Sequence, residues 1–330
     1  MQRTMHAIVH RKYGTPDVLA YEEIERPVPG DEDVLVRVHA AGASIGDYMI
    51  VTGQPYLIRL SPFGGFPRPR NLVPGACMAG RVEAVGRKVT TFRPGDEVYG
   101  EGAPTGAFAE YFVMPATLIA LKPSNLSFEE AAATPWGVNA LQALRDAGGL
   151  KAGQKVLING ASGGVGTWAV QIAKALGAHV TAVCSTRNAE MVRALGADEV
   201  IDYTTHDFVD GGPRFDVVLD TVGNRSVSDC RSVLVPTGAF VSCTGGTSMT
   251  RWLFRLAWML LASRFTSQKL TTFMASPNQK DLVALKELVE AGKLKPVIER
   301  RYALGDVADA LRHVGERHSQ GQTVIQIRVG

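Results

Sequence analysis

Residues 160–166 of the chain read Gly-Ala-Ser-Gly-Gly-Val-Gly and have the composition of a phosphate-binding turn. A run typical of a strand, Lys155 to Asn159, comes directly before them, and a run typical of a helix, Thr167 to Leu176, follows. Glycines between a strand and a helix let the backbone approach a pyrophosphate, and the first helical turn supplies N–H donors and the positive end of the helix dipole. This context predicts a dinucleotide site. The alternative is a tight structural turn in another kind of α/β domain.

The residues at the end of the next predicted strand indicate which dinucleotide binds. In NAD-binding folds, an acidic residue about 20 positions after the glycines holds the ribose 2′-hydroxyl. Here the strand ends in Cys184-Ser185-Thr186-Arg187-Asn188, and no acid follows before Glu190. A hydroxyl and a guanidinium at this place favour a 2′-phosphate, and therefore NADPH over NADH, with Ser185 and Arg187 as ligands. The alternative for Arg187 is a solvated residue at a helix start.

Length and composition describe a globular chain of about two domains. It has 330 residues, 45% of them hydrophobic and 20% charged, as in folded proteins. The net charge of +3 is spread along the chain, so a nucleic-acid partner is not indicated. The N-terminus lacks the apolar core of a secretory signal, and no run reaches the ~20 apolar residues of a membrane span. Four cysteines, none at Cys-x-x-Cys spacing, are interpreted as reduced thiols and predict a cytoplasmic enzyme.

Two regions of different pattern must position the glycine turn. Residues 1–125 hold short alternating runs, such as Val34 to Val38, separated by Gly- and Pro-rich turns, and predict a compact β-rich, barrel-like domain. Ser127 predicts a helix cap with Glu130 at capping-box spacing. Beyond it strands and helices alternate, and the continuous Val/Ile/Leu strands predict a doubly wound parallel sheet.

Several further segments carry a family resemblance. They include Ala40-Ala41-Gly42-Ala43-Ser44-Ile45-Gly46-Asp47, Phe92-Arg93-Pro94-Gly95-Asp96-Glu97-Val98, Gly106-Ala107-Phe108-Ala109-Glu110-Tyr111 and Ala194-Leu195-Gly196-Ala197-Asp198. With these segments in this order, and nearly end to end, the chain resembles the medium-chain dehydrogenase/reductase superfamily, in its quinone oxidoreductase-like branch. The closing portion, from Phe273 to Glu299, is similar to NADPH oxidoreductases of the reticulon-4-interacting-protein type.

The resemblance implies a fold and a domain organisation. A GroES-like, β-rich catalytic domain would comprise residues 1–125, and a Rossmann NADP-binding domain would comprise residues 126–270. Residues 271–330 would return to the catalytic domain, and they end in a predicted strand, Thr323 to Ile327. Dimers are common in the family, so the resemblance also implies a homodimer.

The resemblance further implies cofactor contacts, residue by residue. The pyrophosphate would lie on the glycine turn and the adenosine 2′-phosphate beside the end of the second strand. Four residues would line the nicotinamide half, and an aromatic and a thioether side chain would close over it. The pyrophosphate would contact Ser162, Gly163, Gly164 and Val165, and the 2′-phosphate would contact Ser185, Arg187 and Tyr203. The residues lining the nicotinamide half would be Asn139, Val222, Gly223 and Thr244, and those closing over it would be Phe273 and Met274.

The sequence lacks the ligands of a catalytic zinc ion. The alcohol dehydrogenase branch carries a Cys near position 44 and Gly-His-Glu after a Pro-Gly pair, whereas this chain has Ser44 and Pro74-Gly75-Ala76-Cys77-Met78. Catalytic zinc takes about three protein ligands, which the single thiol of Cys77 does not supply. We therefore expect no metal, and hydride transfer to an acceptor that itself delocalises negative charge, a quinone or an α,β-unsaturated carbonyl. The alternatives are a metal-free alcohol or aldehyde oxidoreductase and a non-catalytic NADPH-binding sensor or partner protein.

Two side chains are candidates to touch the substrate. The segment Asp47-Tyr48-Met49 lies where some quinone reductases put a tyrosine in the cleft, and the closest alignment places Met49 on that tyrosine. Tyr48 would orient the substrate; its alternative role is that of a partly buried structural tyrosine. The hydroxyl of Ser44 would bond a substrate oxygen, and its alternative role is that of a satisfied turn serine. No residue stands out as an obligatory acid or base.

Residues 249–264 combine aromatic and aliphatic residues with Arg251, Arg255 and Arg264. One interpretation is a helix that lies on a membrane surface and reaches lipid-soluble quinones. Others are a lid and a dimer contact. Because apolar residues nearly encircle the predicted helix, burial against protein is the favoured interpretation.

Overall fold

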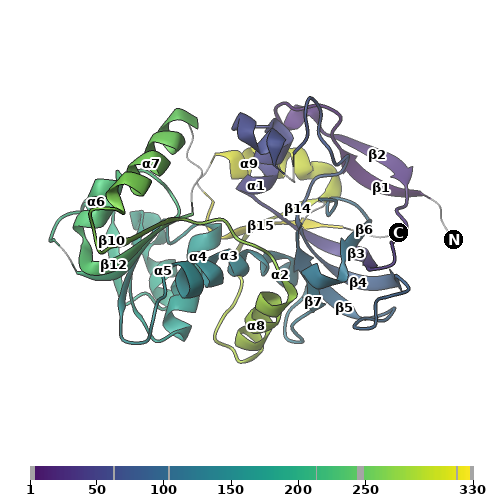
Figure 1. Cartoon of the computed structure of the whole chain (residues 1–330). Helices are drawn as coiled ribbons and strands as arrows, with labels where there is room; N and C mark the ends of the chain where they lie inside the picture. Colours follow the sequence, from purple (N-terminus) through teal and green to yellow (C-terminus); the bar gives the residue numbers. More distant parts are fainter. Residues whose placement is uncertain are drawn as a thin grey trace. The chain divides into compact units, whose positions relative to one another are not determined.

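The computed structural model describes residues 4–61, 64–102, 105–212, 214–243, 249–316 and 319–327 (Figure 1). The chain forms two compact units, residues 1–136 with 277–330 and residues 137–276. The first unit thus takes both ends of the chain. We expected the boundaries between the units after residues 125 and 270. Both lie later in the chain, after residues 136 and 276. The helix at 128–133 packs on strands of the first unit, and Ser276 exchanges two hydrogen bonds with Gln142 of the second.

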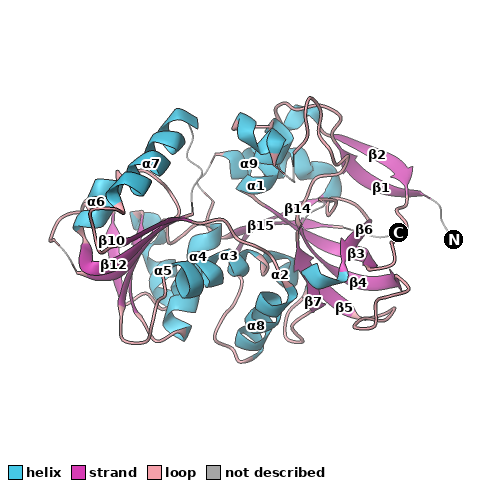
Figure 2. Ribbon diagram, in the orientation of Figure 1, coloured by secondary structure: helices cyan, strands magenta, loops and turns pink. Residues whose placement is uncertain are grey.

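The second unit is built on a six-stranded, all-parallel sheet in the order β10-β9-β8-β11-β12-β13. Figure 2 draws its strands in magenta, with β10 and β12 labelled. Counted within the unit this order is 3-2-1-4-5-6, that of a Rossmann dinucleotide-binding fold. The predicted doubly wound parallel sheet is therefore confirmed. The strands are β8 (Lys155–Asn159), β9 (His179–Cys184), β10 (Glu199–Asp202), β11 (Phe215–Asp220), β12 (Leu234–Ser242) and β13 (Lys269–Thr272).

Helices flank this sheet and bury it. The side chains of Val156, Leu157 and Ile158 in β8 are fully buried, as expected for a parallel strand covered on both faces. No helix among the described residues is long and apolar enough to cross a membrane. Because the strand order reverses between β8 and β11, the carboxyl ends of these strands form the ligand-binding edge in folds of this kind. The helices are α3 (Trp136–Gln142), α4 (Gly164–Ala175), α5 (Ala189–Ala194), α6 (Val227–Ser232) and α7 (Met249–Ala262).

The first unit contains a seven-stranded sheet in the order β14-β15-β3-β4-β5-β7, with β6 also paired to β3. These pairs are antiparallel except for β14 with β15, and β1 and β2 form a separate antiparallel pair. The predicted β-rich domain is confirmed. The strands are β1 (Thr4–Val9), β2 (Ala20–Glu25), β3 (Asp33–Ala43), β4 (Cys77–Val85), β5 (Glu97–Glu101), β6 (Tyr111–Pro115), β7 (Ile119–Leu121), β14 (Ile298–Ala303) and β15 (Gln322–Gln326).

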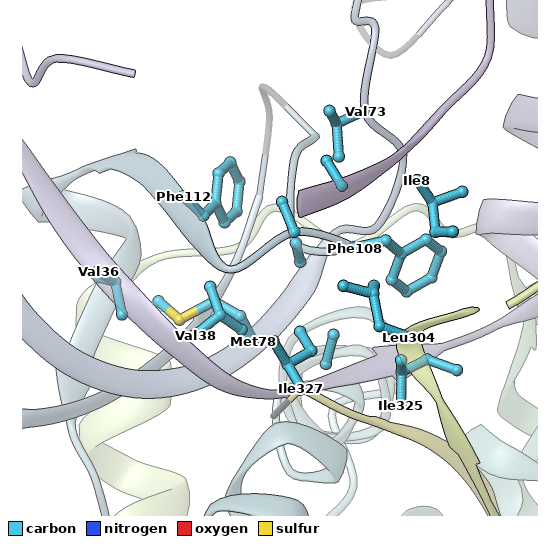
Figure 3. Packing of buried hydrophobic residues seen from close by; sticks show 14 of the residues in the cluster. Ile8, Val36, Val38, Val73, Met78, Phe108, Phe112, Leu304, Ile325 and Ile327 are labelled. Atoms are coloured by element: carbon cyan, nitrogen blue, oxygen red, sulfur yellow. The ribbon is translucent and has the colours of Figure 1, made fainter. Parts of the chain in front are cut away.

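Both ends of the chain contribute to the core of the first unit. Leu304, Ile325 and Ile327 from the closing segment share one buried cluster with Ile8 and Phe108 (Figure 3). Burial of such side chains stabilises the fold by about 1.5–3 kcal/mol each, so the closing segment is an integral part of this unit. The helices of the unit are α1 (Ile45–Thr52), α2 (Phe128–Ala133), α8 (Gln279–Glu290) and α9 (Val307–Gly315).

The helix predicted behind Ser127 is present as α2. The N–H of Glu130 donates to Ser127 Oγ (3.2 Å), and the N–H of Ser127 donates to Glu130 Oε2 (2.9 Å), which completes the predicted capping box. The helix lies so close to β3 that a Cβ on Gly42 would stand 2.8 Å from the carbonyl oxygen of Ala132. Glycine at position 42 therefore lets α2 reach the sheet of the first unit.

Candidate functional site

The glycine turn joins the end of β8 to α4, where the strand order reverses. Gly160 has a φ of +86°, which favours glycine over residues with a side chain. A Cβ on Gly166 would lie 2.1 Å from the carbonyl oxygen of Gly160, so only glycine lets the first turn of α4 lie this close to the strand. These are two of the roles that glycines have in a dinucleotide-binding turn.

The N-terminus of α4 suits a pyrophosphate. Gly163 is the N-cap residue, no side chain caps the helix there, and the first turn contains no acidic residue. The N–H groups of this turn and the helix dipole would therefore meet an anion without a competing carboxylate. The four residues predicted for the pyrophosphate, Ser162 to Val165, all lie at this end of α4. Ser162 Oγ also accepts a hydrogen bond from Asn188 Nδ2 (2.9 Å), a contact that the sequence did not indicate.

The residues predicted for the 2′-phosphate lie at the carboxyl ends of β9 and β10. Ser185 follows β9 directly and is half-buried, and Arg187 is exposed in the short 3-10 turn Thr186–Asn188. Tyr203 follows β10 with an exposed side chain, and its N–H donates to the carbonyl oxygen of Cys184 (3.1 Å). The fold thus places a hydroxyl, a guanidinium and a phenol at one edge of the sheet.

A carboxylate that the sequence analysis missed lies at the same edge. Asp202 ends β10 opposite Cys184, and it accepts hydrogen bonds from the hydroxyls of Thr186 and Thr204. The hydrogen bond from Thr186 is the main reason why the pKa of Asp202 is lower than usual. Asp202 lies outside positions 184–190 in the sequence and reaches this edge from the neighbouring strand. The pairing of β9 with β10 is the signal that places it.

Asp220, at the end of β11, holds the loop that the resemblance assigns to the nicotinamide. Its side chain is fully buried, and Oδ1 accepts hydrogen bonds from the N–H groups of Val222 (3.1 Å) and Gly223 (2.9 Å). The same oxygen accepts from Nδ2 of Asn159 at the end of β8 (3.0 Å). Gly223 has a φ of +77°, a conformation that favours glycine. One buried carboxylate therefore fixes both predicted residues at the switch point of the sheet.

The second oxygen of Asp220 meets an arginine from α7. Arg255 forms an ion pair with Asp220 Oδ2, and its Nη1 donates to the carbonyl oxygen of Arg225 (3.3 Å). The arginine is itself mostly buried, so the pair compensates a charge that water does not reach. In the sequence, Arg255 belongs to the same run as Arg251 and Arg264, and no local pattern distinguishes it from them.

The remaining residues predicted for the cofactor come from separate elements of the second unit. Asn139 is half-buried on α3. Phe273 directly follows β13, and its N–H donates to the carbonyl oxygen of Ser242 at the end of β12 (2.8 Å). Met274 is 87% exposed, and Thr244 lies outside the described residues. The contacts of these four residues with a cofactor stay predictions.

In the first unit, both candidate substrate residues have structural roles. Ser44 caps α1: its hydroxyl donates to Asp47 Oδ2 (2.7 Å), and the N–H of Asp47 donates to Ser44 Oγ (3.2 Å). The ring of Tyr48 packs against α9, where a Cβ on Gly315 would stand 2.7 Å from Cε2 of the tyrosine. These contacts match the structural alternatives for both residues, and contact with a substrate stays a prediction.

Two buried carboxyl groups and a buried thiol lie in the first unit. Cys77 on β4 is directly opposite Glu101 on β5, and both are buried, as is Asp47. Burial raises the pKa of Glu101 to about 8 and that of Asp47 to about 6. Burial also raises the pKa of the Cys77 thiol well above its ordinary value. The capping pattern Ser-x-x-Asp is a local signal for Asp47, whereas no local pattern indicates Glu101.

This donor set does not fit zinc. Zinc takes thiolate, imidazole or carboxylate ligands, about three of them from the protein at a catalytic site, whereas the residues at the expected positions supply only the single thiol of Cys77. Ala76, directly before Cys77, has no donor atom in its side chain, and Ser44 stands where the alcohol dehydrogenase branch carries a cysteine ligand. Within the described ranges, no group of three or more His, Cys, Asp or Glu side chains could hold a metal ion.

Comparison with known proteins identifies the family of the chain. The family model "Alcohol dehydrogenase GroES-like domain" matches residues 30–124, and the model "Zinc-binding dehydrogenase" matches residues 195–325. The chain is 33% identical to the mitochondrial NAD(P)H oxidoreductase RTN4IP1 of Danio rerio, over 98% of this chain and 91% of the relative. It is also 33% identical to the 2-methylene-furan-3-one reductase of Solanum lycopersicum, over 97% of this chain and 79% of the relative.

A solved structure has the same fold. The quinone oxidoreductase from Coxiella burnetii matches with a TM-score of 0.85 and 31% identity, over 98% of this chain and 100% of the other. The predicted GroES-like and Rossmann folds are thereby confirmed, and the protein is an oxidoreductase. The chain belongs to the medium-chain dehydrogenase/reductase superfamily, in its quinone oxidoreductase-like branch.

Proposed function

We propose that the protein transfers a hydride from NADPH to a quinone or an α,β-unsaturated carbonyl, and that it does so without zinc. One combination of observations carries this proposal. The second unit has a dinucleotide-binding turn, while the first has Ser44 and the single thiol of Cys77 where zinc-dependent members of the superfamily carry their ligands. Relatives named for such acceptors, the quinone oxidoreductase of Coxiella burnetii and the 2-methylene-furan-3-one reductase of tomato, support the acceptor class.

NADPH supplies the hydride, and residues of the second unit hold its phosphates. The first turn of α4, from Ser162 to Val165, binds the pyrophosphate through backbone N–H groups. Ser185, Arg187 and Tyr203 bind the 2′-phosphate from the ends of β9 and β10. A guanidinium forms strong, geometrically defined hydrogen bonds with a phosphate, so Arg187 favours NADPH over NADH.

The loop fixed by Asp220 orients the nicotinamide half through Val222 and Gly223. A quinone or an enone spreads the negative charge that arises on hydride transfer over its own carbonyl system, so a Lewis acid is not required. The chain then has to orient the acceptor and donate a hydrogen bond to its oxygen. Ser44 and Tyr48 are the candidates for this contact.

An acceptor panel tests the proposal. Oxidation of NADPH is followed with naphthoquinones, ubiquinone analogues, enones and aldehydes, with NADH in parallel. We expect turnover of quinones or enones, a preference for NADPH, and no loss of rate after treatment with a zinc chelator. Turnover of aldehydes alone would support the metal-free alcohol or aldehyde oxidoreductase. NADPH binding without any turnover would support the sensor, and stoichiometric zinc in the purified protein would contradict the metal-free mechanism.

We further propose a cytoplasmic location, a homodimer, and a peripheral membrane contact through residues 249–264. Cys77, Cys184, Cys230 and Cys243 are all free thiols, which supports a reducing compartment. Light scattering tests the homodimer, because a mass of one chain would contradict it. Accessibility to protease before and after cell lysis tests the location.

A further inference from the structure

The outer face of α7 is apolar and uncovered. Leu260 is 63% exposed, Trp258 and Leu261 are exposed as well, and Phe265 just beyond the helix is 82% exposed. Met259 and Ala262 on the opposite face are buried, and Met259 belongs to the core of the second unit. The expectation that protein buries this segment therefore holds for one face only. The helix is anchored inward by Met259 and Arg255 and presents large apolar side chains outward.

Positive charge accompanies this apolar face. From Cys230 to Ser276, where the second unit ends, the sequence contains no Asp or Glu, but it contains four Arg and one Lys. Arg255 uses its charge internally on Asp220, whereas the side chains of Arg264 and Lys269 are exposed. The net charge of the whole chain is only +3, so this stretch is unusually basic for the protein. A surface of this kind attracts an anionic partner.

An open pocket of about 500 Å³ adjoins the apolar face, and Phe265 is part of its lining. Arg231 also lines it, and Nε of this arginine donates to Gln268 Oε1 (3.0 Å), which orients the guanidinium. A guanidinium among hydroxyl groups is well suited to a phosphate. The hydroxyl groups that line the pocket are those of Ser228, Ser232, Thr266 and Ser267.

We propose that the face formed by Trp258, Leu260, Leu261 and Phe265 docks on an anionic phospholipid bilayer, with a lipid phosphate in the Arg231 pocket. Trp, Leu and Phe beside Arg and Lys are the composition of helices that lie in a membrane interface. The exposed basic side chains of Arg264 and Lys269 favour an anionic partner for this face. The proposal names the lipid class for the membrane contact proposed above, and it does not depend on the acceptor or on turnover.

Vesicle flotation with the full-length protein, NADPH included, tests the proposal. The vesicles are phosphatidylcholine alone and phosphatidylcholine mixed with phosphatidylglycerol. We expect the protein to float with the mixed vesicles and to stay behind with phosphatidylcholine alone. Salt should release it, because attraction to the anionic headgroups is screened.

Two pairs of variants identify the surface. Leu260→Gln/Leu261→Gln should weaken flotation on the order of tenfold or more, because two exposed side chains lose their burial in the lipid. The matched control is Val28→Gln/Leu121→Gln, which removes two exposed apolar side chains of the first unit and should leave flotation unchanged. Arg264→Gln/Lys269→Gln should weaken binding to the mixed vesicles, while Lys151→Gln/Lys155→Gln, two exposed lysines elsewhere in the second unit, should not.

The outcomes separate lipid from protein as the occupant. Failure of the unmodified protein to float with anionic vesicles overturns the proposal without any variant, and it leaves the proposed hydride transfer untouched. A concentration-dependent dimer that Leu260→Gln/Leu261→Gln dissolves would also overturn it, because the face would then belong to a second copy. Thermal unfolding and NADPH binding show that each variant is folded.

Discussion

Arg255 on α7 and Asp220 at the end of β11 form an ion pair inside the second unit. The carboxylate has no exposed surface, and its other oxygen accepts the N–H groups of Val222 and Gly223. One side chain of α7 therefore supports the loop predicted to face the nicotinamide. The helix whose outer face is proposed to meet lipid is thus tied directly to the cofactor edge of the sheet.

Replacing Arg255 by methionine should destabilise the protein by about 3–5 kcal/mol, because Asp220 would keep a buried charge without its partner. Adding Asp220→Asn should recover part of this loss, since the neutral amide needs no counter-charge. Urea unfolding measures both effects. Arg264→Met removes an exposed arginine near the end of α7 and should change the free energy of unfolding by less than ~0.5 kcal/mol. Equal stability of Arg255→Met and Arg264→Met would show that the pair contributes nothing.

The glycine turn offers a matched pair of substitutions. Gly166→Ala places a Cβ 2.1 Å from the carbonyl oxygen of Gly160, whereas the nearest atom to a Cβ on Gly163 is 3.5 Å away. We expect Gly166→Ala to cost about 1–3 kcal/mol, because α4 must move away from β8. Gly163→Ala should unfold like the unmodified protein. Thermal unfolding of the two variants side by side measures the difference, and an undisturbed Gly166→Ala variant would contradict the close approach of helix and strand.

Cofactor preference should depend on two opposite charges at the ends of β9 and β10. Arg187→Gln should lower kcat/KM for NADPH more than for NADH, because it removes a cation next to the predicted 2′-phosphate site. Asp202→Asn should shift the ratio toward NADPH, because it removes a carboxylate that lies against Thr186. Initial rates with both cofactors give the ratio for each variant. A shift toward NADH in Asp202→Asn would mean that this carboxylate does not face the phosphate.

Stability should depend on pH through Glu101. Burial raises its pKa from 4.5 to about 8, so the folded protein holds the proton more tightly than the unfolded chain. The resulting stabilisation is complete below pH 4.5 and is lost as the pH rises through about 8. Urea unfolding between pH 5 and 9 should show a fall on the order of a few kcal/mol.

The variant Glu101→Gln should remove most of this pH dependence, because the amide cannot ionise. Glu32→Gln is the control, since the Glu32 side chain is 76% exposed and should leave the slope as it is. An unchanged slope in Glu101→Gln would show that Glu101 does not titrate as its burial indicates.

The features that sequence analysis predicted correctly are local ones. The glycine turn, the capping box at Ser127 and the alternation of apolar strands with helices each depend on residues a few positions apart. A turn between strand and helix, or a helix cap, is specified by the chemistry of its own residues. The missed features involve partners from distant parts of the chain. Asp202 reaches the predicted 2′-phosphate edge from a neighbouring strand, and Glu101 is brought opposite Cys77 by sheet pairing.

The amino-acid sequence by itself determined a dinucleotide-binding turn and the absence of His and Glu from the zinc-ligand positions, because these properties belong to residue types and short spacings. Only the tertiary structure decided which residues of 249–264 face inward. Met259 is buried and Arg255 is mostly buried, while Leu260 and Leu261 are exposed, although all four lie in one continuous run. Whether an apolar residue is covered depends on the surface that the rest of the fold presents to it, and that surface exists only after distant strands have paired.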